Sequence, residues 1–162
     1  MRKVLIAGCG DEGQQWLDQG WEVVRLDIDE RTNPDVVGDM RDLGDIGQFD
    51  AISCNNALEH VYPHEIHKTL CGFHRNLKEG GHLIIQVPDL EGIEATDEII
   101  SEIGMSGLHL IYGDPARLEE FPYMAHHCGF VEDTLRDCLS KAGFDVTTKR
   151  LPCHQLMGIG VK

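Results

Sequence analysis

Short apolar runs alternate with amphipathic segments along this chain, and that alternation predicts a parallel sheet built from βαβ units. The first five runs are compact and apolar, as in strands that are buried on both faces. We expect strands at Lys3–Ala7, Glu22–Asp27, Val36–Gly38, Ala51–Asn55, His82–Val87, Asp145–Leu151 and Gln155–Val161.

Two helices are predicted in the second half of the chain. The first begins at Pro63, a residue suited to a first helical turn, and Gly80-Gly81 ends it. Its apolar face would consist of Ile66, Leu70, Phe73 and Leu77. The second covers Val131–Ala142 and ends at Gly143.

The remaining connections differ in length. The crossover Asp11–Gly20 holds only about two helical turns. Residues 31–34 predict a loop in place of the next helix. Residues 89–130 interrupt the alternation, with a helix expected at about Ala95–Ile103, and a long insertion after a strand usually lies over a ligand site.

A glycine turn follows the first predicted strand. Gly8-Cys9-Gly10 comes directly after it, and Asp27 ends the second strand 19 residues beyond Gly8. Glycines let the backbone approach a ligand, and a carboxylate at the next strand end accepts hydrogen bonds from ribose hydroxyls. This spacing predicts a site for an adenine nucleoside and fits nicotinamide enzymes equally well.

Further motifs follow the glycine turn at regular intervals. In chain order they are VLIAGCG at residues 4–10, RLDID at 25–29, GDM at 38–40, FDAIS at 49–53, NALEHV at 56–61 and LKEGGHLIIQVPD at 77–89. Together they resemble the class I S-adenosylmethionine-dependent methyltransferases, in particular the small type 11 group. The resemblance covers nearly the whole chain.

The resemblance implies an α/β, three-layer Rossmann-like methyltransferase fold, with a mostly parallel seven-stranded sheet and an antiparallel last strand. It implies S-adenosyl-L-methionine as the cofactor. By the match of motifs, the first loop wraps the methionine end of the cofactor, Asp27 holds its ribose, and the third motif flanks its adenine. The cofactor site would comprise Gly8, Cys9, Gly10, Asp27, Ile28, Asp39, Met40, Asn55 and Leu58.

The chain departs from the family pattern at three places. Ile6 stands where the family usually carries an acidic residue, the third glycine is displaced to Gly13, and Glu79 replaces a proline. The sequence also begins at the first strand, without the helices that help to cover the cofactor. We therefore expect a site that is either open or closed by another subunit, which makes a homodimer possible.

Methyl transfer needs little catalytic machinery from the protein. The cofactor carries the reactivity, and positioning alone can lower the barrier by ~7–11 kcal/mol. A base is required only where the acceptor must lose a proton. Glu59 and His60 follow the fourth strand and are the candidate catalytic residues; alternatively, they shape the loop and cap the next helix. His126 and His127 are more simply explained as loop residues.

No metal site is predicted. His60, His64 and His67 are close in sequence, but Pro63 separates His60 from the other two. His64 and His67 are better explained as residues on a solvated helix face. In the run 126–128 the side chains are adjacent and diverge, so they would share a metal poorly.

The composition and net charge of the chain limit which partners we expect it to bind. The chain has 162 residues, 41% of them hydrophobic, which fits a single domain over residues 1–162. Its net charge of −14 repels the phosphates of nucleic acids and anionic membranes, so we expect neither as a partner. Six cysteines without a C-x-x-C pair indicate free thiols in the cytoplasm. A signal peptide and a transmembrane run are not expected.

The sequence therefore predicts a cytoplasmic methyltransferase that acts on a small-molecule or sugar-like acceptor under a lid formed by residues 89–130. Two alternatives stay open. One is a non-catalytic subunit that binds S-adenosylmethionine for regulation or assembly, which Ile6 and the missing helices suggest. The other is a nicotinamide-dependent reductase.

Overall fold

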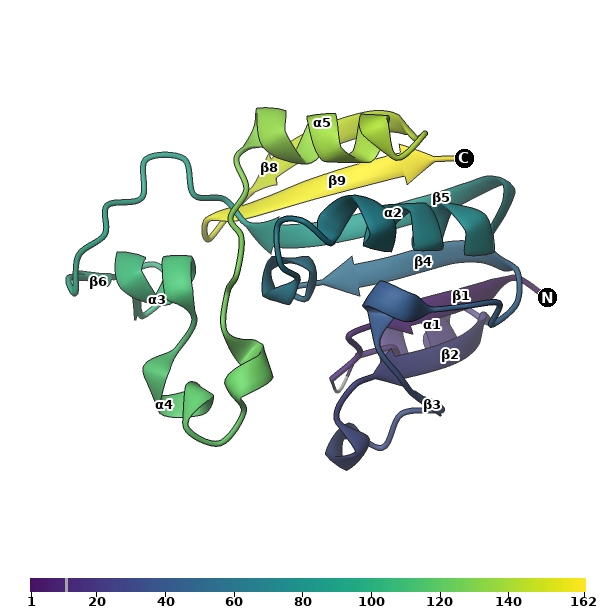
Figure 1. The fold of residues 1–162 in the computed structure, drawn as a ribbon, viewed down its shortest axis with the longest axis horizontal. Coiled ribbons are helices and arrows are strands. Elements are labelled where there is room, and N and C mark those ends of the chain that lie inside the picture. The colour runs from purple at the N-terminus through teal and green to yellow at the C-terminus, as the bar shows by residue number, and fades with distance from the viewer. Residues whose placement is uncertain (11) are drawn as a thin grey trace.

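A single seven-stranded sheet organises the computed structural model, which describes residues 1–10 and 12–162 (Figure 1). Its strands lie in the order β3-β2-β1-β4-β5-β9-β8. Their bounds are β1 Lys3–Ala7, β2 Glu22–Asp27, β3 Val36–Val37, β4 Phe49–Asn55, β5 Leu77–Pro88, β8 Asp145–Leu151 and β9 Gln155–Val161. All seven strands predicted from the sequence are present, with β4 and β5 longer and β3 shorter than expected.

The directions of the strands confirm the predicted fold class. Strands β1 to β5 pair in parallel, while β9 runs antiparallel to both β5 and β8. The register places Ile85 opposite Gly158. A Cβ atom on Gly158 would lie 2.7 Å from Leu139 Cδ1, so a glycine in β9 lets the covering helix approach the sheet closely.

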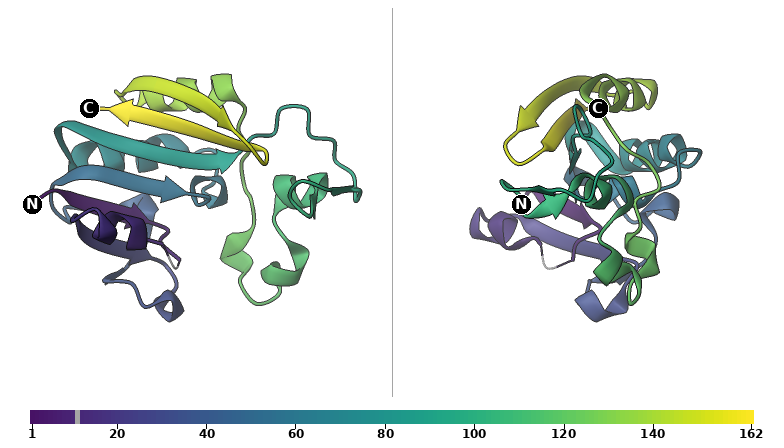
Figure 2. Two further views of the ribbon diagram at one scale, coloured as in Figure 1. Left: turned by 180° about the vertical axis from the view of Figure 1, so that it is seen from behind. Right: turned by 90° about the vertical axis from the view of Figure 1, so that its left-hand side faces the viewer.

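Helices cover the two faces of the sheet unequally (Figures 1 and 2). Helix α1, Gln14–Asp18, lies on one face, and α2, Ile66–Asn76, and α5, Glu132–Lys141, lie together on the other. The apolar sides of α2 and α5 form the main core with the sheet. Its fully buried helical side chains are Leu70, Phe73, Leu135 and Leu139. Each contributes about 1.5–3 kcal/mol by leaving water.

The second predicted helix and both short crossovers are confirmed. Helix α5 occupies almost the whole of the expected range, and Leu135 and Leu139 on it are fully buried in the core. Crossover 11–20 contains only the five-residue α1, although Asp11 lies outside the described residues. After β2 the chain makes one 3₁₀ turn, Glu30–Thr32.

Helix α2 is shorter at both ends than the sequence suggested. Pro63 lies in a turn before the helix, which begins at Ile66. It ends at Asn76, because Leu77 adopts an extended backbone and pairs with Phe49 as the start of β5. The Asn76 amide secures this end by donating to Gly72 O at 2.9 Å and Gly44 O at 3.1 Å. Gly80-Gly81 therefore belongs to the strand and does not stop the helix.

The helix expected at Ala95–Ile103 is wrong. Residues Ile99–Ile100 form β6 and pair antiparallel with Met105–Ser106, which is β7. Two adjacent β-branched side chains favour an extended backbone, and Gly104, with φ +67°, turns the chain between the strands. Helical structure comes later in the segment, as α3 Gly107–Tyr112, α4 Pro115–Leu118 and a 3₁₀ turn at Pro122–Met124.

The two ends of the 89–130 segment meet. Asp89 and Phe130 form an isolated parallel bridge, and Leu90 N donates to Phe130 O at 2.9 Å. The segment projects beyond the carboxyl ends of the parallel strands (Figure 1). Within the described part of the chain, no helix combines the length and hydrophobicity that crossing a bilayer requires.

Candidate functional site: a nucleoside-type cavity at the carboxyl ends of the strands

A cavity of about 710 Å³ lies where the parallel strands end. Its walls come from the loops after β1, β2, β3 and β4 and from residues between Arg117 and His127. Strand β1 lies between β2 and β4, so the chain connections diverge at this point, which is where open α/β sheets bind ligands. Of the residues assigned to the cofactor from sequence, those lining the cavity are Gly8, Cys9, Gly10, Asp27, Ile28, Asp39, Met40 and Asn55.

Gly8 sits at the tightest point of the cavity wall. It has φ +68°, and a Cβ atom there would lie 2.5 Å from Ala57 Cβ in the loop after β4. Its N–H and that of Cys9 both donate to Leu26 O, at 2.9 and 3.1 Å. The turn after β1 is thus fixed to β2 and pressed against the next loop, which only glycine permits.

Asp27 is held rigidly at the end of β2. Its Oδ2 accepts the N–H of Gly10 at 2.9 Å, and its Oδ1 accepts the N–H of Asp29 at 2.9 Å. The residue is buried yet lines the cavity. Each carboxylate oxygen can accept a second hydrogen bond, so the group fits the paired hydroxyls of a ribose.

Glu12 supplies a second carboxylate that the sequence analysis missed. It lines the cavity, and its Oε2 accepts a hydrogen bond of 2.9 Å from the Asn55 amide. Burial raises the pKa of Glu12. Ile6 instead packs in a small core cluster with Val4 and Ala51. Glu12 could have been identified in the sequence as an acidic residue inside the glycine turn, near the amide residue that ends β4.

Asp39 and Met40 are positioned by their neighbours. Asp39 caps a 3₁₀ turn, Met40–Asp42, by accepting the Arg41 N–H at 2.8 Å. The Arg41 guanidinium also pairs with Asp39, which lowers the pKa of that carboxyl, and binds Glu65 at 3.0 Å. The Met40 sulfur lies 3.9 Å from Cys54 Sγ, against the core.

The three residues Leu58–His60 form one 3₁₀ turn and point in three directions. His60 lines the cavity. Glu59 is only 2% exposed and does not reach the cavity wall. Leu58 is fully buried in the main core and, unlike the other residues assigned to the cofactor, does not line the cavity.

Burial shifts the pKa values of Glu59, His60 and the nearby His126. It raises the pKa of Glu59 to about 8 and lowers the pKa of His60 and of His126. Near neutral pH both imidazoles are therefore neutral. The rings of His60 and His126 lie 5.1 Å apart, which brings together two residues that the sequence separates widely.

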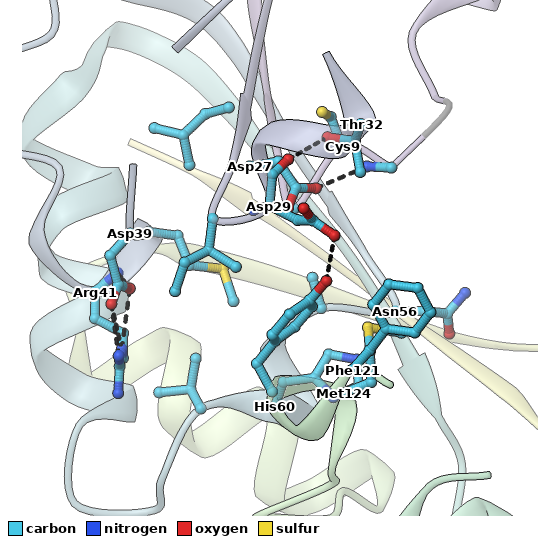
Figure 3. Close-up of a pocket in the computed structure, with 18 of the residues that line it drawn as sticks. Cys9, Asp27, Asp29, Thr32, Asp39, Arg41, Asn56, His60, Phe121 and Met124 are labelled. Atoms are coloured by element: carbon cyan, nitrogen blue, oxygen red, sulfur yellow. Dashed lines mark hydrogen bonds and ion pairs between the residues drawn. The ribbon is translucent and has the colours of Figure 1, made fainter. Parts of the chain in front are cut away.

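The end of the 89–130 segment closes one side of the cavity (Figure 3). The Tyr123 hydroxyl donates to Asp29, whose carboxylate also binds Arg31 at 2.8 Å. The Arg31 guanidinium lies 4.4 Å from the centre of the Phe121 ring. Nearby, the His127 ring stacks on Tyr62 with centroids 4.0 Å apart, so His127 is a wall residue as well as a loop residue.

The fold, the glycine turn and the buried strand-end carboxylate together define a class I S-adenosylmethionine-dependent methyltransferase. The profile of the family described as "Methyltransferase domain" matches residues 2–149, and the chain belongs to this family. The class and the cofactor expected from the sequence are thereby confirmed, and the nicotinamide-dependent alternative is set aside. No curated protein matches the sequence.

Several solved structures with a similar fold are methyltransferases. One is the 1,6-didemethyltoxoflavin N1-methyltransferase of Burkholderia thailandensis, with its substrate and S-adenosylhomocysteine bound: 21% identity, TM-score 0.72, 99% of this chain and 70% of that chain covered. A methyltransferase from Archaeoglobus fulgidus has 17% identity and TM-score 0.71, and the match covers 99% of this chain and 86% of that chain. A glycopeptide N-methyltransferase with S-adenosylmethionine has 16% identity and TM-score 0.69, with 99% and 87% covered.

Proposed function

We propose that this methyltransferase acts on a small-molecule acceptor that binds beneath a lid formed by the 89–130 segment. The observation that carries the proposal is the composition of the cavity. One side consists of the strand-end loops that the motifs assign to the cofactor, and the other consists of residues between Arg117 and His127. A volume of about 710 Å³ leaves space for a compact second ligand.

The residues present fit S-adenosylmethionine. Asp27 offers two fixed carboxylate oxygens to the ribose hydroxyls, and Asp39 and Met40 lie where the adenine is expected. Glu12, held by Asn55, offers a carboxylate to the cofactor's ammonium group in place of the acid missing at Ile6. When bound, the cofactor supplies an electrophilic methyl group on sulfur.

The acceptor side combines aromatic and basic groups. Phe121, Tyr123 and His127 provide flat apolar surface, and His60 presents a neutral imidazole to the cavity. An imidazole in this position can take the proton of a hydroxyl acceptor. Glu59 is enclosed behind His60, and we assign it no direct contact with the acceptor.

The toxoflavin and glycopeptide enzymes support a small or sugar-bearing acceptor only by likeness of fold. A non-catalytic subunit has less support than the sequence suggested, because Glu12 supplies the carboxylate that Ile6 lacks. A cytoplasmic location, a homodimer and the absence of a nucleic-acid partner remain predictions from the sequence.

Calorimetry with S-adenosylmethionine tests the placement of the cofactor. We expect saturable binding to the native protein and at least tenfold weaker binding to Asp27→Ala, because hydrogen bonds to a charged group contribute ~1.5–3 kcal/mol. Asp35→Ala is the matched control. Asp35 also accepts a backbone N–H beside β2, from Arg25 at 2.8 Å, but lies outside the cavity.

A screen with methyl-labelled cofactor tests the acceptor class. Label should appear on small hydroxyl or amine compounds. Transfer only to nucleic acid or to protein would contradict the proposal, and equal binding by native protein and Asp27→Ala would contradict the assigned cofactor site.

A further inference from the structure

We propose that Glu59, His60 and His126 form a binding site for one first-row divalent metal ion of the Zn²⁺ type, with an open coordination position toward the cavity. One ligand atom from each of these residues lies within 4.8 Å of the others. Two come from the 3₁₀ turn after β4, and the third comes from the far end of the 89–130 segment. Along the chain His64 and His67 are the histidines nearest to His60, and only the fold brings His126 beside it.

Both histidines are oriented as metal ligands are. His60 Nδ1 lies 3.1 Å from Ala125 O, and His126 Nδ1 lies 2.8 Å from Leu110 O. A carbonyl oxygen only accepts, so each Nδ1 carries the proton and each Nε2 keeps its lone pair. Metal-binding histidines usually donate their other ring N–H to a carbonyl or carboxylate in this way.

Glu59 supplies an unsatisfied carboxylate. The residue is 2% exposed, and its Oε2 is buried with no hydrogen-bond partner. Leaving such an oxygen unpaired costs about 1–3 kcal/mol. A cation between the two imidazoles and the carboxylate would remove that cost, and nothing else described at this position does so.

Backbone contacts hold the two segments together. The N–H groups of His127 and Cys128 both donate to Glu59 O, at 2.8 and 3.2 Å. The stretch around His126 is therefore fixed along the turn that carries the other two ligands. Ligands of one Zn²⁺ at ~2.0–2.1 Å from the metal lie roughly 3–4 Å apart, which is only slightly closer than the 4.8 Å within which the three ligand atoms already lie.

The ligand set selects the kind of metal. Two imidazoles and one carboxylate suit Zn²⁺ and its transition-metal neighbours, whereas Mg²⁺ and Ca²⁺ prefer oxygen ligands alone. Three protein ligands leave a further position free. Of the three ligands only His60 lines the cavity, so we assign the free position to that side of the metal.

A role in the reaction rests on the proposed methyl transfer. A hydroxyl acceptor bound to the metal loses its proton to solvent more readily. A lone pair of its oxygen then forms the bond to the methyl carbon, while the carbon–sulfur bond breaks and its electron pair stays on sulfur. The His60 lone pair is occupied by the metal in this case, so the metal replaces imidazole as the activating group. The acceptor class is accordingly an oxygen nucleophile.

The test is a titration of chelator-treated full-length protein with Co²⁺ and with Zn²⁺. The readouts are the visible absorption of bound Co²⁺ and the calorimetric stoichiometry of Zn²⁺. We expect one equivalent of each, and at least tenfold weaker binding in Glu59→Gln and in His126→Gln. His64→Gln and His67→Gln, on exposed positions, are the matched controls and should bind as the native protein does.

Two results would overturn the proposal: no saturable one-equivalent binding by the native protein, or binding that both ligand variants retain. If Glu59→Gln does not fold, His126→Gln decides, since its side chain is only partly buried. S-adenosylmethionine binding by the same metal-free samples is measured in parallel. Its presence without metal binding would reject the metal site alone, and its absence would reject the cofactor site.

Discussion

Tyr123 donates a hydrogen bond from its hydroxyl to the carboxylate of Asp29, joining two residues 94 positions apart. Asp29 follows Asp27 at the end of β2, and Tyr123 lies near the end of the 89–130 segment. Arg31 contacts both partners, with its guanidinium 2.8 Å from Asp29 and 3.2 Å from the Tyr123 hydroxyl. The contact therefore fastens the proposed lid to the proposed ribose-binding loop.

Tyr123→Phe should release the product S-adenosylhomocysteine about 3 to 10 times faster. The lost hydrogen bond goes to a charged group, but solvent screening near the surface weakens it, so the expected effect is modest. Stopped-flow dissociation measures the effect. Tyr112→Phe is the control, because Tyr112 is 61% exposed and lies outside the cavity. Identical release rates in the two variants would show that the contact does not retain the ligand.

Gly8→Ala should weaken cofactor binding at least tenfold. The added Cβ would meet Ala57 Cβ at 2.5 Å, so the glycine turn must move. Gly20→Ala is the matched control: its φ of +77° carries a similar conformational cost, about 1–2 kcal/mol, with no heavy atom within 4 Å of the added Cβ. Urea unfolding should show that both variants are less stable than the native protein, while calorimetry should show weaker cofactor binding for Gly8→Ala alone.

Glu12 should make cofactor binding depend on pH. Burial raises the pKa of its carboxyl above the ordinary 4.5, whereas an ammonium partner stabilises the ionised form and lowers the pKa in the complex. Binding therefore releases a proton at mildly acidic pH, and affinity rises with pH until Glu12 is ionised in the free protein. Calorimetry from pH 4.5 upward measures this dependence.

The Glu12→Gln variant should bind more weakly at neutral pH and lose that part of the pH dependence. Glu79→Gln, at a side chain that is 90% exposed, should reproduce the native curve. A native-like pH profile in Glu12→Gln would remove Glu12 from the cofactor site.

Leu58→Ala should destabilise the fold by about 2–5 kcal/mol, because the side chain is fully buried in the main core. The folded fraction should still bind the cofactor with unchanged affinity. Leu17→Ala, at a leucine that is 50% exposed, should cost far less stability. Weakened cofactor binding without lost stability would indicate that Leu58 contacts the cofactor.

The sheet was predictable because its strands are buried on both faces and therefore read as uninterrupted apolar runs. Val4 to Ala7 is an example, and its four residues are all buried. The ends of α2 were not predictable, since Leu77 suits a helix face and a strand equally well. Its pairing with Phe49, a contact distant in sequence, decides between them.

Residues at strand ends could be predicted to line the cavity, as Asp27 and Asn55 do. The site was not predictable where residues meet across long separations. His126 comes beside His60 only because the backbone around it pairs with Glu59. Similarly, a helix was expected around Ile99 and Ile100, yet their pairing with Met105 and Ser106 gives a hairpin.

The bridge between Asp89 and Phe130 gives the 89–130 segment a fixed base, since β5 ends on one side of it and α5 begins just beyond the other. A segment of another length or composition can be joined to the same two anchors without altering the pairing of any sheet strand. Under the proposed function, acceptor recognition therefore belongs to one exchangeable segment. Exchanging it between homologous chains would transfer substrate preference as a unit while the cofactor loops remain as they are.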